Sequence, residues 1–317
     1  MIRRKLVIDT DPGIDDAIAV FMAMQSPELD VIALTTVFGN ASVEETTRNA
    51  HTLIDAAERP DVRVISGASA PLARPYAGAI PHIHGADGLG DGGISRSATP
   101  ASQGLSAAEF ICQEARKRNG TLSILALGPL TNLALALRLD SDLQDRVESL
   151  TIMGGNAFCP GNASPCAEAN MLGDPEAADV VLGARWPVTL VGLDVTQRIR
   201  LNPQTLERIC SGTSARSGVL RSAIPLYKRF YLETNGIDGI LCHDPAAVAM
   251  LLRPGLFQLT RLPIRVETAG LGRGKTWPDV GGTDHPAAEW RGRPSVSIAV
   301  EVDADAVESL VVERLAD

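Results

Sequence analysis

The sequence lacks the features that would place the protein on a membrane or on a nucleic acid. No apolar run approaches the roughly 20 residues that a membrane-spanning helix needs. Positive charge is in deficit, because 29 lysines and arginines stand against 38 aspartates and glutamates and leave a net charge of −9. Aromatic residues are few, and no basic run is interleaved with them. We therefore expect a small-molecule partner and neither a nucleic acid nor a membrane.

Cysteine is also scarce. The five cysteines are scattered, odd in number and without C-x-x-C spacing, which favours free thiols in a reducing compartment. Cys159 and Cys166 share one loop rich in glycine and proline, so a disulfide between them is the alternative. Near the N-terminus the apolar run covers only Leu6 to Ile8, which is too short for a secretion signal. We expect a cytoplasmic protein.

What the chain does contain is a regular alternation of strand and helix patterns. Short runs of valine, isoleucine and leucine predict buried strands, and the longer segments between them have helical periodicity. We expect strands at 5–8, 31–37, 62–65, 122–127, 150–153 and 188–191, and helices at 15–24, 43–58, 105–118 and 129–139. This rhythm predicts an α/β fold with an open, mostly parallel, doubly wound sheet and helices on both faces.

The pattern changes after residue 202, where helical segments dominate. Helices are expected at 203–210, 215–234, 244–252 and 304–315, with antiparallel strands near 264–267 and 295–302. No composition shift marks a linker, so we expect residues 1–317 to form a single domain with a helical C-terminal addition. Two helix starts carry local signals: Ser106 and Glu109 have capping-box spacing, and Pro129 falls in the first turn of its helix.

An unusual concentration of acid follows the first strand. The segment DTDPGIDDA, residues 9–17, places Asp9, Asp11, Asp15 and Asp16 within eight residues. Like charges this close repel one another and need a counter-charge, a proton or water. A hard cation such as Ca²⁺ would supply the counter-charge through oxygen ligands, whereas the chain has no cluster of soft ligands for zinc or copper.

Other polar segments also follow predicted strands. Phe38-Gly-Asn40, Leu127-Gly128 and Met153-Gly-Gly-Asn156 each come directly after one. In an open α/β sheet ligands bind outside the carboxyl ends of the strands, so these segments predict one site together with the aspartates. Two interpretations remain open at this point: an Mg²⁺-dependent aspartyl phosphatase, which also begins with Asp-x-Asp, or carboxylates that merely cap the helix.

Histidines supply the remaining candidates. His243 stands next to Asp244 and Pro245 at the start of a predicted helix, where its role is structural or catalytic. His82 and His84 lie in the long connection 67–104, and loops of this length in a compact domain are usually functional.

These motifs resemble the inosine–uridine-preferring nucleoside hydrolase family. Asp9-Thr-Asp-Pro-Gly-Ile-Asp-Asp-Ala17 is similar to the family signature. The resemblance continues through Phe38–Asn40, Ile83–Leu89, Leu127–Asn132, Met153–Gly155, Glu168–Asn170, Asp174–Ala177, His243–Pro245, Gly270–Thr276 and Asp279. It implies an open α/β sheet with Ca²⁺ at its edge and hydrolysis of ribonucleosides to ribose and free base. Family members tend to form dimers or tetramers, so we expect a homodimer or homotetramer.

The resemblance also implies residue roles. Ca²⁺ would be held by the carboxylates of Asp11, Asp16 and Asp244 and by the backbone carbonyl of Leu127, a position that is usually Thr in the family. Asp15, Asn40 and Asn170 would hydrogen-bond the ribose diol, Asn162 and Glu168 the 5′-hydroxyl, and Met153 would line the ribose pocket.

The expected chemistry divides between two residues. Asp11 would take a proton from the attacking water, and His243, whose ordinary pKa lies near working pH, would protonate the departing base. Tyr227 and Tyr231 would contact the base or belong to the core, and His84 would close over the base. A nucleoside- or ribose-binding protein without turnover is the non-enzyme alternative.

Overall fold

A computed structural model describes residues 3–97, 104–282 and 287–316. Its main feature is a nine-stranded sheet in the order β10-β9-β11-β6-β5-β4-β1-β2-β3. The strands are β1 (Arg4–Thr10), β2 (Leu29–Thr36), β3 (Arg63–Ile65), β4 (Leu122–Ala126), β5 (Val147–Met153), β6 (Val188–Val191), β9 (Phe257–Val266), β10 (Thr276–Pro278) and β11 (Ser295–Val302). All pairings from β3 to β11 are parallel, and β9 and β10 add antiparallel strands at one edge.

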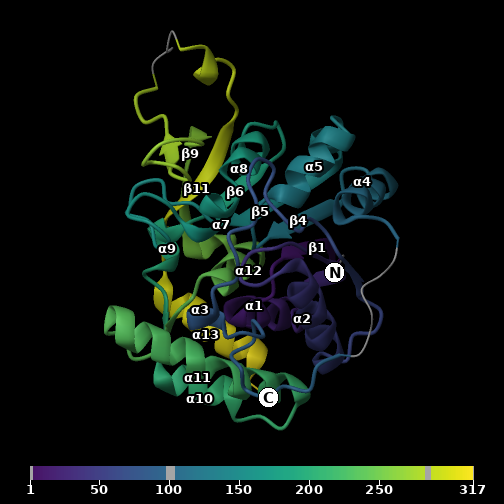
Figure 1. Cartoon of the computed structure of the whole chain (residues 1–317), viewed down its shortest axis with the longest axis vertical. Coiled ribbons are helices and arrows are strands. Elements are labelled where there is room, and N and C mark those ends of the chain that lie inside the picture. The colour runs from purple at the N-terminus through teal and green to yellow at the C-terminus, as the bar shows by residue number, and fades with distance from the viewer. Residues whose placement is uncertain (1–2, 98–103, 283–286, 317) are drawn as a thin grey trace.

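Helices cover both faces of the sheet (Figure 1). One face packs against α1 (Ile14–Met24), α2 (Val43–Ala56), α11 (Ala215–Asn235), α12 (Asp244–Leu252) and α13 (Ala304–Leu315). The other packs against α4 (Ala107–Arg118), α5 (Thr131–Leu139) and α8 (Pro175–Leu182). The shorter helices are α3 (Pro81–His84), α6 (Leu143–Arg146), α7 (Ala169–Gly173), α9 (Leu193–Thr196) and α10 (Pro203–Cys210), and β7 (Arg200–Leu201) pairs with β8 (Ile240–Leu241) as a separate ribbon.

The central strand shows why its sequence forms this layer. Leu6 and Ile8 of β1 point into the core beside α1, and Val7 points into the opposite core. Because successive side chains of a strand alternate between faces, a run of three apolar residues is buried only when both faces are covered. Every residue of α1 is buried, so its polar first turn lies inside the protein at the carboxyl end of β1.

The expected fold class is confirmed, and most element bounds agree within a few residues. The capping box of Ser106 and Glu109 is present at the start of α4. The prediction for Pro129 is wrong, because α5 begins at Thr131 after Leu130, and residues 127–130 form the turn that follows β4 instead. The antiparallel strands expected after residue 202 are also present, but they extend the main sheet, so this part of the chain is not only helical.

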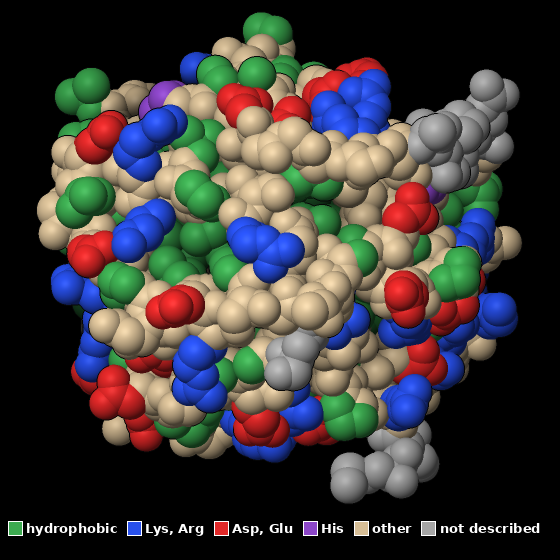
Figure 2. All heavy atoms as spheres, turned by 90° about the horizontal axis from the view of Figure 1, so that it is seen from below, with side chains coloured by type: hydrophobic (Ala, Val, Ile, Leu, Met, Phe, Trp, Pro, Cys, Tyr) green, Lys and Arg blue, Asp and Glu red, His purple; other side chains and the backbone are tan. Residues whose placement is uncertain are grey.

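Two further expectations concern the cysteines and the surface. All five cysteines are free thiols, so Cys159 and Cys166 do not pair. None of the helices in the described ranges has the length and apolarity needed to cross a membrane. On the face that carries α10 and α11, lysines and arginines surround hydrophobic side chains (Figure 2), and a hollow of about 450 Å³ opens beside Leu206 and Leu232. No residue of the predicted site lines this hollow.

Candidate active site

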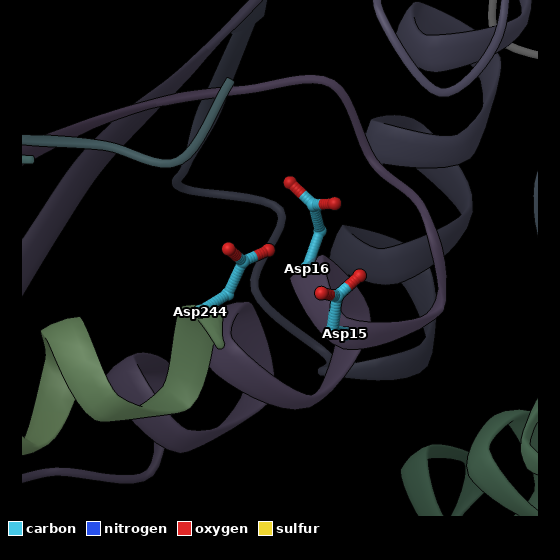
Figure 3. Close-up of side chains that lie close together, drawn as sticks. All are labelled: Asp15, Asp16 and Asp244. Atoms are coloured by element: carbon cyan, nitrogen blue, oxygen red, sulfur yellow. The ribbon is translucent and has the colours of Figure 1, made fainter. Parts of the chain in front are cut away.

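Three carboxylates converge where β1 passes into α1. Asp15 and Asp16 lie in the first turn of α1, and Asp244 opens α12, more than 200 residues later (Figure 3). One oxygen from each lies within 4.8 Å of the other two, and all three residues are buried. The long-range contact between α1 and α12 therefore builds the acidic cluster that the local sequence only half contains.

Asp11 borders this cluster and is only 2 % exposed. Its Oδ2 accepts a hydrogen bond of 2.8 Å from the backbone N–H of Asn40. The Asn40 side chain donates to the backbone oxygen of Asp11 at 3.2 Å and to Oδ2 of Asp16 at 3.1 Å. Asn40 thus joins the end of β2 to both ends of the aspartate motif.

Glycines make room for the Asp11 carboxylate. A Cβ atom at Gly39 would lie 2.0 Å from Oδ2 of Asp11, and one at Gly128 would lie 2.5 Å from Oδ1. Real side chains do not approach this closely, so both positions need glycine for the carboxylate to remain where it is. The two glycines come from the ends of β2 and β4, on either side of β1.

The pKa values of these carboxylates differ from those of an exposed aspartate. Burial, followed by the charge of Asp16, raises the pKa of Asp11 well above its usual range, and burial with the charges of Asp15 and Asp16 does the same for Asp244. Burial also raises the pKa of Asp15 and of Asp16 to about 6. Removing carboxylates from water disfavours their charged form unless a cation compensates.

The donor set fits a hard cation. No lysine or arginine of the described residues forms an ion pair with Asp11, Asp15, Asp16 or Asp244. Oδ1 of Asp11 and Oδ1 of Asp15 are buried without a hydrogen-bond partner. Buried carboxylate oxygens without donors are the ligands that calcium or magnesium ions take. Asp16 also accepts the N–H of Gly13 at 2.9 Å, so the capping interpretation holds for this one carboxylate.

A second group of polar side chains follows β4 and β5. The backbone oxygen of Leu127 accepts a 2.6 Å hydrogen bond from Nδ2 of Asn170, which also donates to the oxygen of Met153 at 3.2 Å. Glu168 is buried and accepts N–H groups from Gly155, Asn170 and Met171 at 2.9–3.1 Å. The carboxylate of Glu168 therefore organises the turn into α7.

Asn162 lies apart from this group. It is exposed, and Oδ1 accepts the N–H of Ala169 at 3.1 Å, which holds the loop before α7. The other candidates, Leu127, Met153, Glu168 and Asn170, are joined by hydrogen bonds, whereas Asn162 lies outside this group.

Aromatic side chains and histidines form the opposite side of the site. Nε2 of His243 lies 3.0 Å from the hydroxyl of Tyr231, and Nδ1 lies 2.9 Å from Oγ1 of Thr196. The Tyr231 hydroxyl is 3.3 Å from that of Tyr227, which donates to Oδ2 of Asp15 at 3.1 Å. A continuous hydrogen-bonded chain therefore runs from His243 to the acidic cluster.

The direction of these hydrogen bonds follows from Asp15, the last residue of the series. An ionised carboxylate only accepts, so the Tyr227 hydroxyl donates to Asp15 and accepts from Tyr231. Tyr231 then accepts from Nε2–H of His243, and Nδ1 accepts from Thr196. Burial, followed by the charge of His84, lowers the pKa of His243 to about 4. The ordinary pKa of histidine, expected for His243 from the sequence, does not apply, because the ring is buried and neutral at neutral pH.

His84 is fixed rather than free to close over a ligand. It is 4 % exposed, its Nδ1 accepts the N–H of Ile14 at 3.1 Å, and its ring centre lies 5.3 Å from that of Tyr227. Burial lowers its pKa to about 4. Tyr227 and Tyr231 are themselves buried, and Phe230 contacts both rings.

Sequence reasoning missed Thr196 as a contributor to the site, and it placed Gly39 and Gly128 at the site without giving either a role. Thr196 lies in α9, directly after β6, so the rule that ligands bind beyond the carboxyl ends of strands would have found it. Gly39 lies within the motif Phe38–Asn40, but only the three-dimensional structure shows that its missing side chain makes room for Asp11.

Comparison with known proteins agrees with this geometry. The sequence model of the family described as inosine-uridine preferring nucleoside hydrolase matches residues 6–309. Uridine nucleosidase 1 of Arabidopsis thaliana is 40% identical over 312 residues, which are 98% of this chain and 93% of the relative. The inosine-uridine preferring nucleoside hydrolase of Leishmania major is 35% identical, covering 98% of this chain and 97% of the relative.

Solved structures give the same result. The plant nucleoside hydrolase PpNRh1 superposes with a TM-score of 0.96 at 37% identity, covering 99% of both chains. The purine-preferring ribonucleoside hydrolase of Gardnerella vaginalis gives a TM-score of 0.90 at 31% identity, covering 98% of both chains. Against the aspartyl phosphatase alternative, these similarities span the whole fold as well as the aspartate motif. The chain therefore belongs to the inosine-uridine preferring nucleoside hydrolase family and is a ribonucleoside hydrolase.

Proposed function

We propose that the enzyme hydrolyses the N-glycosidic bond of ribonucleosides with Ca²⁺ held by Asp11, Asp16, Asp244 and the backbone oxygen of Leu127. The observation that carries this proposal is the set of four buried carboxylates, Asp11, Asp15, Asp16 and Asp244, none of which pairs with a lysine or arginine in the described part of the chain. When bound, Ca²⁺ would offset their charge and lower the pKa of a water molecule beside the sugar.

The ribose is proposed to bind over the same carboxylates. Asp15, Asn40 and Asn170 would accept from and donate to the 2′- and 3′-hydroxyls, with Met153 below the sugar. Glu168 and Asn162 would contact the 5′-hydroxyl from the turn before α7. Positive charge develops on the sugar as the glycosidic bond breaks, and fixed carboxylates next to the sugar stabilise it.

Asp11 is the proposed general base. One of its oxygens is held by the N–H of Asn40, and the other is buried without a partner, so its two lone pairs would serve the ion and the proton of the water molecule. Transfer of that proton leaves hydroxide to attack C1′ of the ribose as the base departs.

His243 is the proposed general acid for the departing base. Its ring is neutral at rest, so it would first take a proton from solvent, and the negative charge that grows on the base favours the resulting imidazolium, which would then transfer this proton to the base. Thr196 and Tyr231 hold both ring nitrogens, which orients the imidazole. The base is proposed to lie against Tyr227, Tyr231 and His84.

A panel of nucleosides tests the proposal. The purified protein with about 1 mM CaCl₂ is incubated with inosine, guanosine, adenosine, uridine and cytidine, and ribose and free base are both quantified. Equal amounts of ribose and base are expected from at least one nucleoside. Tight binding of a nucleoside without release of base would favour the binding-protein alternative, and activity restored by Mn²⁺ or Zn²⁺ but not by Ca²⁺ would refute the choice of ion.

We also propose a homodimer or homotetramer, by analogy with the family, a cytoplasmic location, in keeping with the free thiols, and one domain that spans residues 1–317. Light scattering on the eluted protein measures its mass against the 33.5 kDa of one chain. A monomer would contradict the first of these proposals, and two separate unfolding transitions would contradict the last.

A further inference from the structure

The glycine-rich segment that follows His84 packs as a closed, tightly held loop. Asp87 accepts the N–H groups of Leu89 and Asp91 at 2.7 and 3.0 Å, and Gly90 donates to the backbone oxygen of His84 at 2.7 Å. On its outer side the loop lies directly on α11, since a Cβ atom at Gly90 would be 2.5 Å from the oxygen of Ala223. We call residues 85–93 the glycine loop.

One buried amide fastens this loop to the aspartate motif. Asn49 lies in α2 and is 0 % exposed. Its Nδ2 donates to the backbone oxygen of Pro12 at 3.0 Å and to that of Asp87 at 3.0 Å, so both amide hydrogens are used. A Cβ atom at Gly88 would lie 2.7 Å from this nitrogen, which shows how closely the loop approaches.

Arg96 fixes the orientation of that amide. Its Nη2 donates to Oδ1 of Asn49 at 2.7 Å, to Oε2 of Glu45 at 2.6 Å and to the backbone oxygen of Asp87 at 3.3 Å. The two ends of a carboxamide have the same shape, so a donor at the oxygen decides which end carries the NH₂ group. With Arg96 in place, the donors of Asn49 face Pro12 and Asp87.

The two groups held by Asn49 belong to the two segments that contact His84. Pro12 precedes Gly13, at which a Cβ atom would lie 2.6 Å from Nδ1 of His84, and the next N–H, that of Ile14, donates to the same nitrogen. Asp87 follows His84 by three residues in the glycine loop. The place of His84 against Tyr227 therefore depends on the distance between the aspartate motif and the glycine loop, which Asn49 spans.

We propose that Asn49, oriented by Arg96, is a positioning residue of the active site. It fastens the glycine loop to the aspartate motif and so sets His84 and Tyr227 at the side of the site where the base is proposed to bind. The kinetic part of this inference rests on the proposed function.

Substitution of Asn49 by alanine tests the inference. Displacement of active-site groups by about 1 Å costs up to roughly 100-fold in rate, so we expect kcat/KM of Asn49→Ala to fall 10- to 100-fold at a temperature well below its Tm. Hydrogen exchange of the backbone amides of residues 84–91 should accelerate in the same variant, because the loop has lost its anchor. Both effects should appear at saturating Ca²⁺.

Asn202→Ala is the matched control. Asn202 is also a hydrogen-bonded amide with a structural role, since it caps α10 and donates to Glu308 at 2.7 Å. These contacts involve no residue of the aspartate motif. We expect it to lower Tm and leave both kcat/KM and exchange in the glycine loop at the wild-type level. If Asn49→Ala behaves like this control, Asn49 has only a structural role and the inference is wrong.

A second variant keeps the test decisive if Asn49→Ala does not fold. Arg96→Met leaves Asn49 in place and removes the donor at its oxygen, so we expect a smaller loss of kcat/KM and faster exchange in the same segment. Wild-type exchange in Arg96→Met would overturn the inference. If the wild-type enzyme hydrolysed no ribonucleoside, the proposed function would fail, whereas the anchoring by Asn49 would still be decided by the exchange data alone.

Discussion

The hydroxyl of Tyr231 lies 3.0 Å from Nε2 of His243, and this contact connects the proposed acid to the carboxylate of Asp15 through Tyr227. The two residues come from different helices, α11 and the start of α12. Because Asp15 belongs to the acidic cluster, the base side and the sugar side of the site share one hydrogen-bonded network. A change at either end should therefore alter the other.

Loss of the His243 side chain should discriminate between leaving groups. A natural base leaves poorly without a proton, so we expect His243→Ala to lower kcat on inosine or uridine by about 10²–10⁴-fold. A p-nitrophenyl riboside releases a stable phenolate and should lose little. The measurement is kcat on both substrates.

Tyr231→Phe is the companion variant. It keeps the aromatic ring and removes only the hydroxyl, so we expect the same selectivity with a smaller loss. Equal loss on both substrates in His243→Ala would mean that His243 does not protonate the base, and the acid would then be sought among Tyr231, His82 and His84.

The ribose contacts predict strong discrimination against 2′-deoxynucleosides. Asp15, Asn40 and Asn170 are proposed to hydrogen-bond the diol, and a site built to hydrogen-bond a hydroxyl often rejects an analogue without it by about 10⁴-fold. The loss should fall mostly on kcat. Similar kcat/KM for uridine and 2′-deoxyuridine would contradict the proposed ribose contacts.

Local sequence was sufficient for most of the fold. The strand Leu6-Val7-Ile8 and the all-apolar helix after Asp16 are buried as predicted because their patterns fit only a covered, parallel sheet. The same logic placed Asn40 and Leu127 at strand ends, and both contact the aspartate motif, Asn40 at Asp11 and Leu127 at Asp9.

What the sequence did not reveal depends on burial and on contacts between distant segments. Nothing in the neighbourhood of His243 indicates that its pKa falls to about 4, because this follows from its enclosure by α9 and α11. His84 was expected to close over a ligand, but its tie to Ile14 comes from a backbone N–H 70 positions away. The anchoring of the glycine loop by Asn49 is of the same kind.

Removal of the metal should destabilise the protein. A ligand that binds only the folded state adds about 2.7 kcal/mol at a concentration 100 times its Kd, so chelation should lower Tm by several degrees. Activity should disappear together with the bound ion, and Ca²⁺ should restore both. An unchanged Tm after exhaustive chelation would contradict a cation within the acidic cluster.

The metal-free protein should also respond to pH in an unusual direction. Burial raises the pKa of Asp9, Asp15 and Asp16 from 3.8 to about 6. Between these values the folded state binds more protons than the unfolded state. The stability that these protons contribute is therefore fully present below pH 3.8 and is lost as the pH rises through about 6. Burial also raises the pKa of Asp11 and Asp244, which acts in the same direction. The lowered pKa of His51, His84 and His243 acts in the opposite direction, because the unfolded state binds protons there that the folded state does not. The raised carboxylates outnumber these histidines, so we expect the Tm of the chelated protein to be higher at about pH 5 than at about pH 7.5. With saturating Ca²⁺ the difference in Tm should shrink or reverse, since protons then compete with the ion. A chelated protein that is more stable at the higher pH would argue against carboxylates buried without a compensating charge.

The space left by Gly39 predicts a variant that separates activity from stability. A Cβ atom there would lie 2.0 Å from Oδ2 of Asp11, whereas its backbone conformation is one that alanine can adopt. In Gly39→Ala the carboxylate must therefore turn away from Asn40, and we expect kcat to fall by at least 10²-fold because the proposed base is displaced. Tm should change by only a few degrees, since the end of a side chain moves and the backbone does not.

Gly255→Ala is the control, because a Cβ atom at Gly255 meets nothing within 4 Å and its backbone is equally permissive. Calorimetric titration with Ca²⁺ should show weaker binding in Gly39→Ala and not in Gly255→Ala. Wild-type kcat in Gly39→Ala would show that the position of Asp11 seen here is not the one that catalysis uses.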